Sequence, residues 1–303
     1  MTLLETAANP YATRLGEPET ATARLNLAQS FNGLAVFIAP VIGTIFILSG
    51  TSHSKEELVA MPALEKIAYL SGEADSVKIP YLILAGFLIL LAIAFYFIDL
   101  PELEDKNEVQ TTGGIFDTLK YSHVRWAVIA QLFYVGAQVC VTSFFVRMAI
   151  KGGGVDEKTA GFYLSAYGVL FMVGRFSGTA IMRFVPPARL LSLYAAVCIL
   201  LGAAAIYTEG KFVVLALGGL GFFMSIMFPT IFSLGIMGLK EETKPASSLI
   251  VMSIIGGAIF PVIMGRIIDS FGDNIQIGYI VPLICYFFVL YFGLVGHKVK
   301  AVN

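Results

Sequence analysis

Long apolar segments of similar length recur along most of this chain, and they constrain its fold more than any other feature. A membrane-spanning helix needs about 20 mostly apolar residues. Complete candidate spans are found at 25–49, 79–99, 124–150, 159–184, 188–208, 212–238, 246–270 and 276–296. Only 14% of the residues are charged, against roughly 25% in soluble domains. We therefore predict an all-α fold, a polytopic bundle of transmembrane helices.

The spacing of the spans predicts two halves. Short loops join the last six spans, which favours antiparallel neighbours in one bundle. A hydrophilic stretch, residues 100–122, precedes them, and we interpret it as a cytoplasmic connector. Residues 123–303 would then be a six-helix C-terminal half, and residues 1–99 the remainder of an N-terminal half. Because residues 1–11 are too few for a span, we expect the chain to begin inside a larger protein, as a fragment or through a misplaced start codon.

The distribution of Lys and Arg predicts the orientation. Eleven of them fall in one set of alternate loops and eight in the other. Cytoplasmic loops carry the excess of positive charge, so the first set and the C-terminus are expected to be cytoplasmic.

Several classes of function find no support in the sequence. The net charge of −1 gives no basic surface for nucleic acid. The three cysteines lie in separate apolar runs and are expected to be buried hydrophobes: Cys140, Cys198 and Cys285. The three histidines are expected in solvated loops, without metal-ligand spacing: His53, His123 and His297. Neither a nucleotide-binding glycine motif nor a pairing of nucleophile and base is found, so we predict neither ATP-driven transport nor an enzyme.

Five segments carry a resemblance to a known family. They are ETAANPY with the following RLNLAQSFN (5–32), RWAVIAQLFYVGAQ (125–138), VGRFSGT (173–179), MSIMFPTIFSLGI (224–236) and SSLIVMSIIGGAIFPVIMG (247–265). Together they resemble the sugar:proton symporters of the major facilitator superfamily, within these the fucose permease and glucose/galactose transporter group. The resemblance runs over essentially the whole chain. It implies twelve helices in two halves that work by alternating access, with this chain starting in the fourth helix.

The resemblance also implies roles for individual residues. Glu5 matches the helix-four acid that couples transport to protons. Gln29 and Asn32 match sugar-binding amides of helix five, and Gln131 and Gln138 match those of helix seven. Physical chemistry agrees with these roles, since a side-chain amide both donates and accepts hydrogen bonds, as sugar hydroxyls do. The alternatives are a structural Glu5 paired with Lys or Arg, and amides that only join helices.

Three further residues are candidates for the sugar or proton network. Asn9 lies one helical turn from Glu5, Thr142 continues the stripe of Gln138, and the ring of Phe228 could stack on a sugar. At Thr142 the fucose permease has Trp, and at Met227 and Phe228 it has Gln and Tyr. The Met-Phe-Pro sequence is more similar to the glucose/galactose branch, which leaves the sugar open.

Basic residues near the end of the 159–184 span have two interpretations. Arg175 and Arg183 would end that span and Arg189 would open the next. In the wider superfamily, basic residues here latch the two halves together on the cytoplasmic side, and the alternative is anchoring by positive charge. Gly174 and Gly178 form a GxxxG pattern that predicts close helix packing.

From these observations we predict proton-coupled sugar import, with L-fucose preferred and glucose or galactose as the alternative. A sugar sensor that does not transport is the rival from another class. The resemblance implies the bacterial inner membrane, with the proton gradient as energy source and no cofactor. We expect a monomer whose partners are a sugar, protons and the lipid bilayer. The 303-residue chain is not expected to transport alone, because missing helices would expose polar faces to lipid.

Overall fold

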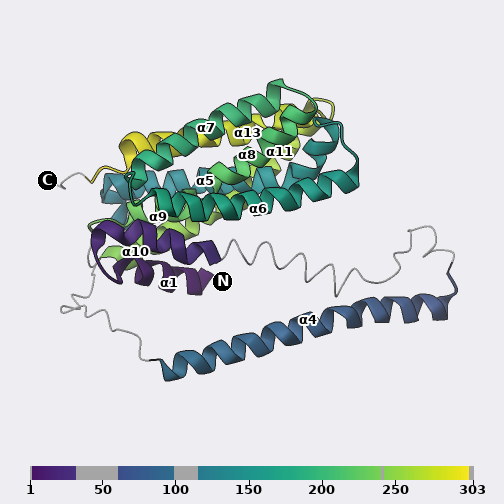
Figure 1. Ribbon diagram of the computed structural model, residues 1–303, viewed down its shortest axis with the longest axis horizontal. Helices are drawn as coiled ribbons and strands as arrows, with labels where there is room; N and C mark the ends of the chain where they lie inside the picture. Colours follow the sequence, from purple (N-terminus) through teal and green to yellow (C-terminus); the bar gives the residue numbers. More distant parts are fainter. Residues whose placement is uncertain (1, 32–60, 99–114, 240–241, 300–303) are drawn as a thin grey trace. The chain divides into compact units, whose positions relative to one another are not determined.

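The computed structural model describes residues 2–31, 61–98, 115–239 and 242–299 (Figure 1). Every regular element within these ranges is a helix, which confirms the predicted all-α class. The chain forms two compact units, residues 34–102 and the remainder, and each is described separately below.

Seven helical segments in the described ranges are long and apolar enough to cross a membrane. They are Lys78–Phe97, Ser122–Lys151, Glu157–Ile181, Pro187–Tyr207, Lys211–Gly235, Thr243–Ser270 and Ile275–Gly296. They coincide with seven of the predicted spans, and the chain is therefore a multi-pass membrane protein. Most of the predicted span 25–49, including Pro40, lies outside the described residues.

The unit formed by residues 34–102 contains α4 (Ala63–Phe97), which corrects one boundary of the sequence analysis. Residues 50–78 lie between the predicted spans 25–49 and 79–99, yet the helix already begins at Ala63. This first part is rich in Ala, Leu, Glu and Lys, which favour helix whether or not they lie in lipid. Polarity here therefore marks where the apolar span starts, not where the helix starts.

The other unit contains the remaining helices. Its first segment consists of α1 (Thr2–Arg14), η1 (Pro18–Thr20) and helical residues 21–31. The elements that follow are η2 (Ile115–Lys120), α5 (Ser122–Lys151), α6 (Glu157–Ile181), α7 (Pro187–Tyr207), α8 (Lys211–Met224), α9 (Met227–Gly235), α10 (Thr243–Met252), η4 (Ser253–Ile255), α11 (Gly256–Ser270), α12 (Ile275–Gly278), α13 (Ile280–Tyr291) and the π-helical η5 (Phe292–Gly296).

Helix α5 lies at the centre of this unit and packs against α6, α9, α11 and α13 (Figure 1). The closest approach is at Gly256, where an added Cβ would lie 2.0 Å from the carbonyl oxygen of Leu132. His123 is the second residue of α5 and is only 1% exposed, so its prediction as a solvated loop residue was wrong. The helix starts earlier than the apolar run does, and its first turn already faces the core.

The side chain of Arg24 stabilises the first segment as a helical hairpin. Its guanidinium donates to the carbonyl oxygens of Ala12, Thr13 and Glu17, at 3.3, 2.8 and 2.8 Å. Gly16 allows the tight turn through a φ of +115°. The hairpin lies against the rest of the unit, with α1 beside α10 (Figure 1).

The span predicted at 212–238 is interrupted. Helix α8 ends at Met224 and α9 begins at Met227, so Ser225 and Ile226 form a break. Proline has no backbone N–H, so Pro229 leaves the carbonyl of Ser225 without its usual helical donor. That free carbonyl becomes part of the candidate site.

Asp156 gives a pH-dependent prediction for the start of α6. Its carboxylate accepts from the backbone N–H and the hydroxyl of Thr159, at 3.0 and 2.6 Å, and these hydrogen bonds hold its pKa below the usual value. Because the pKa is lowered in the folded protein, the charged cap contributes its full stabilisation at pH values above the ordinary pKa of Asp. That stabilisation is lost as the pH falls through the lowered pKa. Asp156→Ala should speed amide hydrogen exchange in the first turn of α6 at neutral pH.

Asp156→Asn is the matched control, because Asn caps helices about as well as Asp but does not titrate. It should keep the protection at neutral pH and abolish its acid dependence. Equal acid dependence in Asp156→Asn and the parent would show that another group controls this turn.

Candidate functional site

A row of buried polar side chains joins helical residues 21–31 to α9. The hydroxyls of Thr22 and Ser233 lie 2.8 Å apart, and the amide of Asn26 donates to the hydroxyl of Thr230 at 3.2 Å. All four residues are at most 3% exposed. Thr22 and Asn26 are four residues apart, and Thr230 and Ser233 are three apart, so each pair shares a helix face. We call these four residues the polar seam.

The seam consists of neutral hydrogen bonds. Besides its contact with Thr230, the amide of Asn26 donates to the carbonyl of Thr22 at 2.9 Å. The hydroxyl of Thr230 donates in turn to the carbonyl of Ile226 at 2.6 Å. Neutral hydrogen bonds contribute about 0.5–1.5 kcal/mol net each. The seam can therefore hold two segments together and still be opened.

Arg175 continues this contact toward the middle of the helices. Its guanidinium donates to the carbonyl of Ser225 at 2.8 Å, which is the carbonyl freed by Pro229. It also donates to the carbonyl of Gln29 at 2.6 Å and lies 4.8 Å from the ring centre of Phe171. One buried cation thus joins residues 21–31, α6 and the break between α8 and α9.

The position of Arg175 differs from the predicted one. It was placed at the end of a span together with Arg183, yet it lies inside α6 and is only 5% exposed. Arg183 and Arg189 are exposed, beyond the end of α6 and at the start of α7. The burial follows from Gly174, which lets α6 approach α8 so closely that the next side chain points into the contact.

Two of the predicted sugar residues come together. The amide nitrogen of Gln29 donates to the amide oxygen of Asn9 at 2.9 Å, which links residues 21–31 to α1. Asn9 is 4% exposed, and its own nitrogen has no partner among the described residues. Glu5 lies one turn earlier on α1, but its side chain is outside the described residues, as is all of Asn32. Asn9 and Gln29 are therefore the two predicted sugar residues that a side-chain hydrogen bond joins.

The other residues predicted to contact the sugar, on α5 and α9, are buried to different degrees. Gln131 is fully buried, and neither atom of its amide has a partner in the part of the chain that the structure describes. Gln138 is half-buried, and its backbone carbonyl accepts from the hydroxyl of Thr142 at 2.9 Å. Phe228 is half-buried on α9 and packs against the core. Among them, Gln138, Thr142 and Phe228 are half-buried and have the accessible surface that a sugar contact needs.

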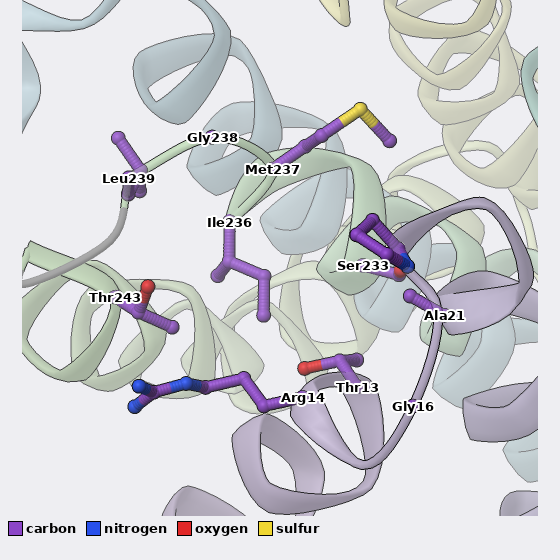
Figure 2. A pocket seen from close by; sticks show the side chains of 11 residues that line it. Thr13, Arg14, Gly16, Ala21, Ser233, Ile236, Met237, Gly238, Leu239 and Thr243 are labelled. Atoms are coloured by element: carbon purple, nitrogen blue, oxygen red, sulfur yellow. The ribbon is translucent and has the colours of Figure 1, made fainter. Parts of the chain in front are cut away.

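A cavity of about 350 Å³ lies at one end of the polar seam, between the tight turn at Gly16 and the end of α9 (Figure 2). Its lining includes Arg14, Ser233 and Thr243, and Figure 2 shows Arg14 and Thr243 on separate helices at its wall. None of the predicted sugar residues lines it. We therefore place the candidate site at Asn9 and Gln29 and not in this cavity.

The sequence analysis assigned no role to the four residues of the polar seam. One signal was present, since Asn26 precedes Gln29 by three residues and so repeats the spacing of Gln29 and Asn32. Thr230 and Ser233 gave no such signal, because hydroxyl residues are common in transmembrane helices and usually bond to their own backbone.

Comparisons with known proteins agree with this architecture. The sequence profile of the Major Facilitator Superfamily matches residues 1–252. A glucose/galactose transporter of Brucella abortus (strain 9-941) is 36% identical over 300 residues, which cover 98% of this chain and 69% of that protein. The L-fucose-proton symporter of Escherichia coli K12 is 37% identical over 299 residues, covering 96% of this chain and 68% of the symporter.

One solved structure is similar along almost the whole chain. It is the crystal structure of a Major Facilitator Superfamily transporter, FucP, in the outward conformation. The two chains are 36% identical, the TM-score is 0.87, and the match covers 96% of this chain and 72% of that one.

Proposed function

Because this chain belongs to the major facilitator superfamily, we propose that it carries a sugar across the membrane together with a proton, by alternating access. The observation that carries the proposal is the bond between Asn9 and Gln29. Two amides from separate helices meet there, one turn from Glu5, and they offer the mixed donors and acceptors that sugar hydroxyls require.

The proton step is assigned to Glu5. A carboxyl within a membrane helix costs roughly 2.5–3.5 kcal/mol on insertion scales, so it marks a functional site by default. Glu5 would take up a proton while the site faces one side and release it on the other. Asn32, Gln131, Gln138, Thr142 and Phe228 would complete the sugar site as the halves move.

For the sugar we propose L-fucose, the substrate named for the symporter of Escherichia coli. Glucose or galactose is the second candidate. It is favoured by the sequence Met227-Phe228-Pro229, which is more similar to the glucose/galactose branch, and by the name of the Brucella relative.

The proposal extends to the setting of the protein. Residues 1–99 would belong to the N-terminal half, 100–122 to the connector and 123–303 to the C-terminal half. The protein would lie in the bacterial inner membrane as a monomer, with its C-terminus in the cytoplasm, and would use the proton gradient without a cofactor. Arg183 and Arg189, both exposed, would then face the cytoplasm and hold the halves together there.

Uptake in membrane vesicles tests the proposal. The chain as printed is compared with a form extended upstream of Met1 in its gene, with labelled L-fucose, D-galactose and D-glucose in parallel. We expect sugar to accumulate only when the proton gradient is imposed, with L-fucose preferred. Accumulation of none of the three sugars by either form would contradict the proposal, and a preference for galactose or glucose would establish the second candidate.

A further inference from the structure

We infer that Arg175 is a positioning residue that couples occupancy of the sugar site to the opening of the polar seam. The inference rests on the proposed function, since it names how that same site controls the movement of the helices. Arg175 lies inside α6, and within the described residues it is hydrogen-bonded neither to Asn9 nor to a side chain of the polar seam. Its two acceptors lie in different segments of the chain.

The first argument is the cost of burying the charge. A buried cation is tolerated only when its hydrogen-bonding groups are satisfied. Within the described residues, Arg175 has no carboxylate partner, and its acceptors are the two carbonyls of Gln29 and Ser225. Hydrogen bonds from a charged donor are stronger than neutral ones. The bond to Gln29 is therefore the strongest single contact that we find between residues 21–31 and the helices that follow the connector.

The second argument is which bond must break. Ser225 lies on the same side of the connector as α6, in the break between α8 and α9, and α8 packs closely against α6. Gln29 lies in the segment that precedes the connector. If residues 21–31 move away from α9, Arg175 can keep its hydrogen bond to the carbonyl of Ser225, but its hydrogen bond to the carbonyl of Gln29 must break. The guanidinium thus acts as a clasp that closes only when the polar seam is closed.

The third argument is that Gln29 serves both sites. Its carbonyl accepts from Arg175, while its side-chain amide donates to Asn9 in the proposed sugar site. A sugar that bonds to this amide competes with Asn9 and changes the restraints on the residue whose backbone Arg175 holds. Because Thr22, Asn26 and Gln29 lie on one helical segment, a displacement at Gln29 is transmitted to the seam.

Thiol labelling can measure opening of the seam directly. Ser30→Cys is the reporter, because Ser30 is fully buried one turn after Asn26 and its hydroxyl donates to the carbonyl of Asn26. Ser192→Cys is the control reporter, since Ser192 is buried on α7 against η5, away from residues 21–31. The native Cys140, Cys198 and Cys285 are all buried, so background labelling with N-ethylmaleimide should be low.

Arg175→Gln should raise the labelling rate of Ser30→Cys about tenfold, as expected for the loss of one hydrogen bond to a charged donor. Arg175→Lys keeps the charge but lacks the planar fork that reaches two carbonyls, and it should give an intermediate increase. Arg266→Gln, which removes an exposed cation near the end of α11, should change nothing.

The sugar arm tests the coupling itself. L-fucose, D-galactose or D-glucose should change the labelling of Ser30→Cys when Arg175 is present, and this response should be lost in Arg175→Gln. An unchanged labelling rate in Arg175→Gln would overturn the inference. An equal increase at Ser192→Cys would also overturn it, because Arg175 would then stabilise the whole bundle and not the seam.

Labelling without sugar needs no transport, so the inference and the proposed function can fail separately. If no sugar is accumulated but Ser30→Cys still opens in Arg175→Gln, the proposed function fails and the clasp remains. If uptake is normal and labelling does not respond to Arg175, the clasp fails and the proposed function remains.

Discussion

Glu5→Gln is expected to abolish proton-driven sugar accumulation, so that the internal sugar concentration stops at passive equilibration. The amide has nearly the shape of a protonated carboxyl but cannot release a proton. The sugar should still exchange across the membrane, because Gln can offer the hydrogen bonds of a neutral carboxyl. The position of Glu5, one turn from the bonded pair Asn9 and Gln29, makes it the acid nearest to the proposed sugar site along α1.

Two measurements on the same vesicles check this result. Accumulation is followed under an imposed proton gradient, and exchange is followed with labelled sugar on one side and unlabelled sugar on the other. Glu19→Gln is the matched control, since Glu19 is exposed in η1 and lies outside the bundle. Normal accumulation by Glu5→Gln would remove Glu5 from the coupling mechanism.

Gly174→Ala is expected to lower the thermal stability of the protein. An added Cβ would lie 2.3 Å from the carbonyl oxygen of Phe222 and 2.7 Å from the hydroxyl oxygen of Ser225. The first neighbour is backbone, so α6 and α8 would have to move apart. Overpacking of this kind costs about 1–3 kcal/mol. The shift would also pull Arg175, the next residue, away from the break at Ser225.

Gly168→Ala provides the comparison on the same helix. No atom lies within 4 Å of the Cβ that this substitution would add. Alanine favours helix over glycine by about 0.5–1 kcal/mol, so Gly168→Ala should be neutral or slightly stabilising. The measurement is the midpoint of thermal unfolding in detergent, followed by fluorescence-detected size exclusion. Equal midpoints for the two variants would show that α6 and α8 do not approach each other as closely as described.

The two substitutions bear on the GxxxG pattern of Gly174 and Gly178. The sequence predicted that these glycines let helices approach, and both do lie where a Cβ would meet a neighbour: Phe222 for Gly174 and Ile226 for Gly178. The pattern could not say which helix would be the neighbour, because small residues permit a close contact without selecting its partner.

The amino-acid sequence by itself determined that this is an all-α membrane protein and where along the chain its membrane spans lie. Runs of about 20 apolar residues have few stable alternatives to a membrane helix, because in lipid every backbone N–H and C=O must be hydrogen-bonded within the segment. For the same reason the predicted spans between 79 and 296 are all found. The family resemblance was also accessible, because it rests on local motifs such as ETAANPY and VGRFSGT.

Only the tertiary structure decided which polar groups meet. Arg175 looked like the end of a span, and its burial depends on Gly174 and on a carbonyl that Pro229 frees on another helix. Asn26 and Thr230, whose side chains are hydrogen-bonded, are 204 residues apart in the sequence. No local sequence pattern connects them. A helix fixes the face on which a side chain lies through its own periodicity. What stands opposite that face is set by packing between distant segments, and no spacing within one helix contains that information.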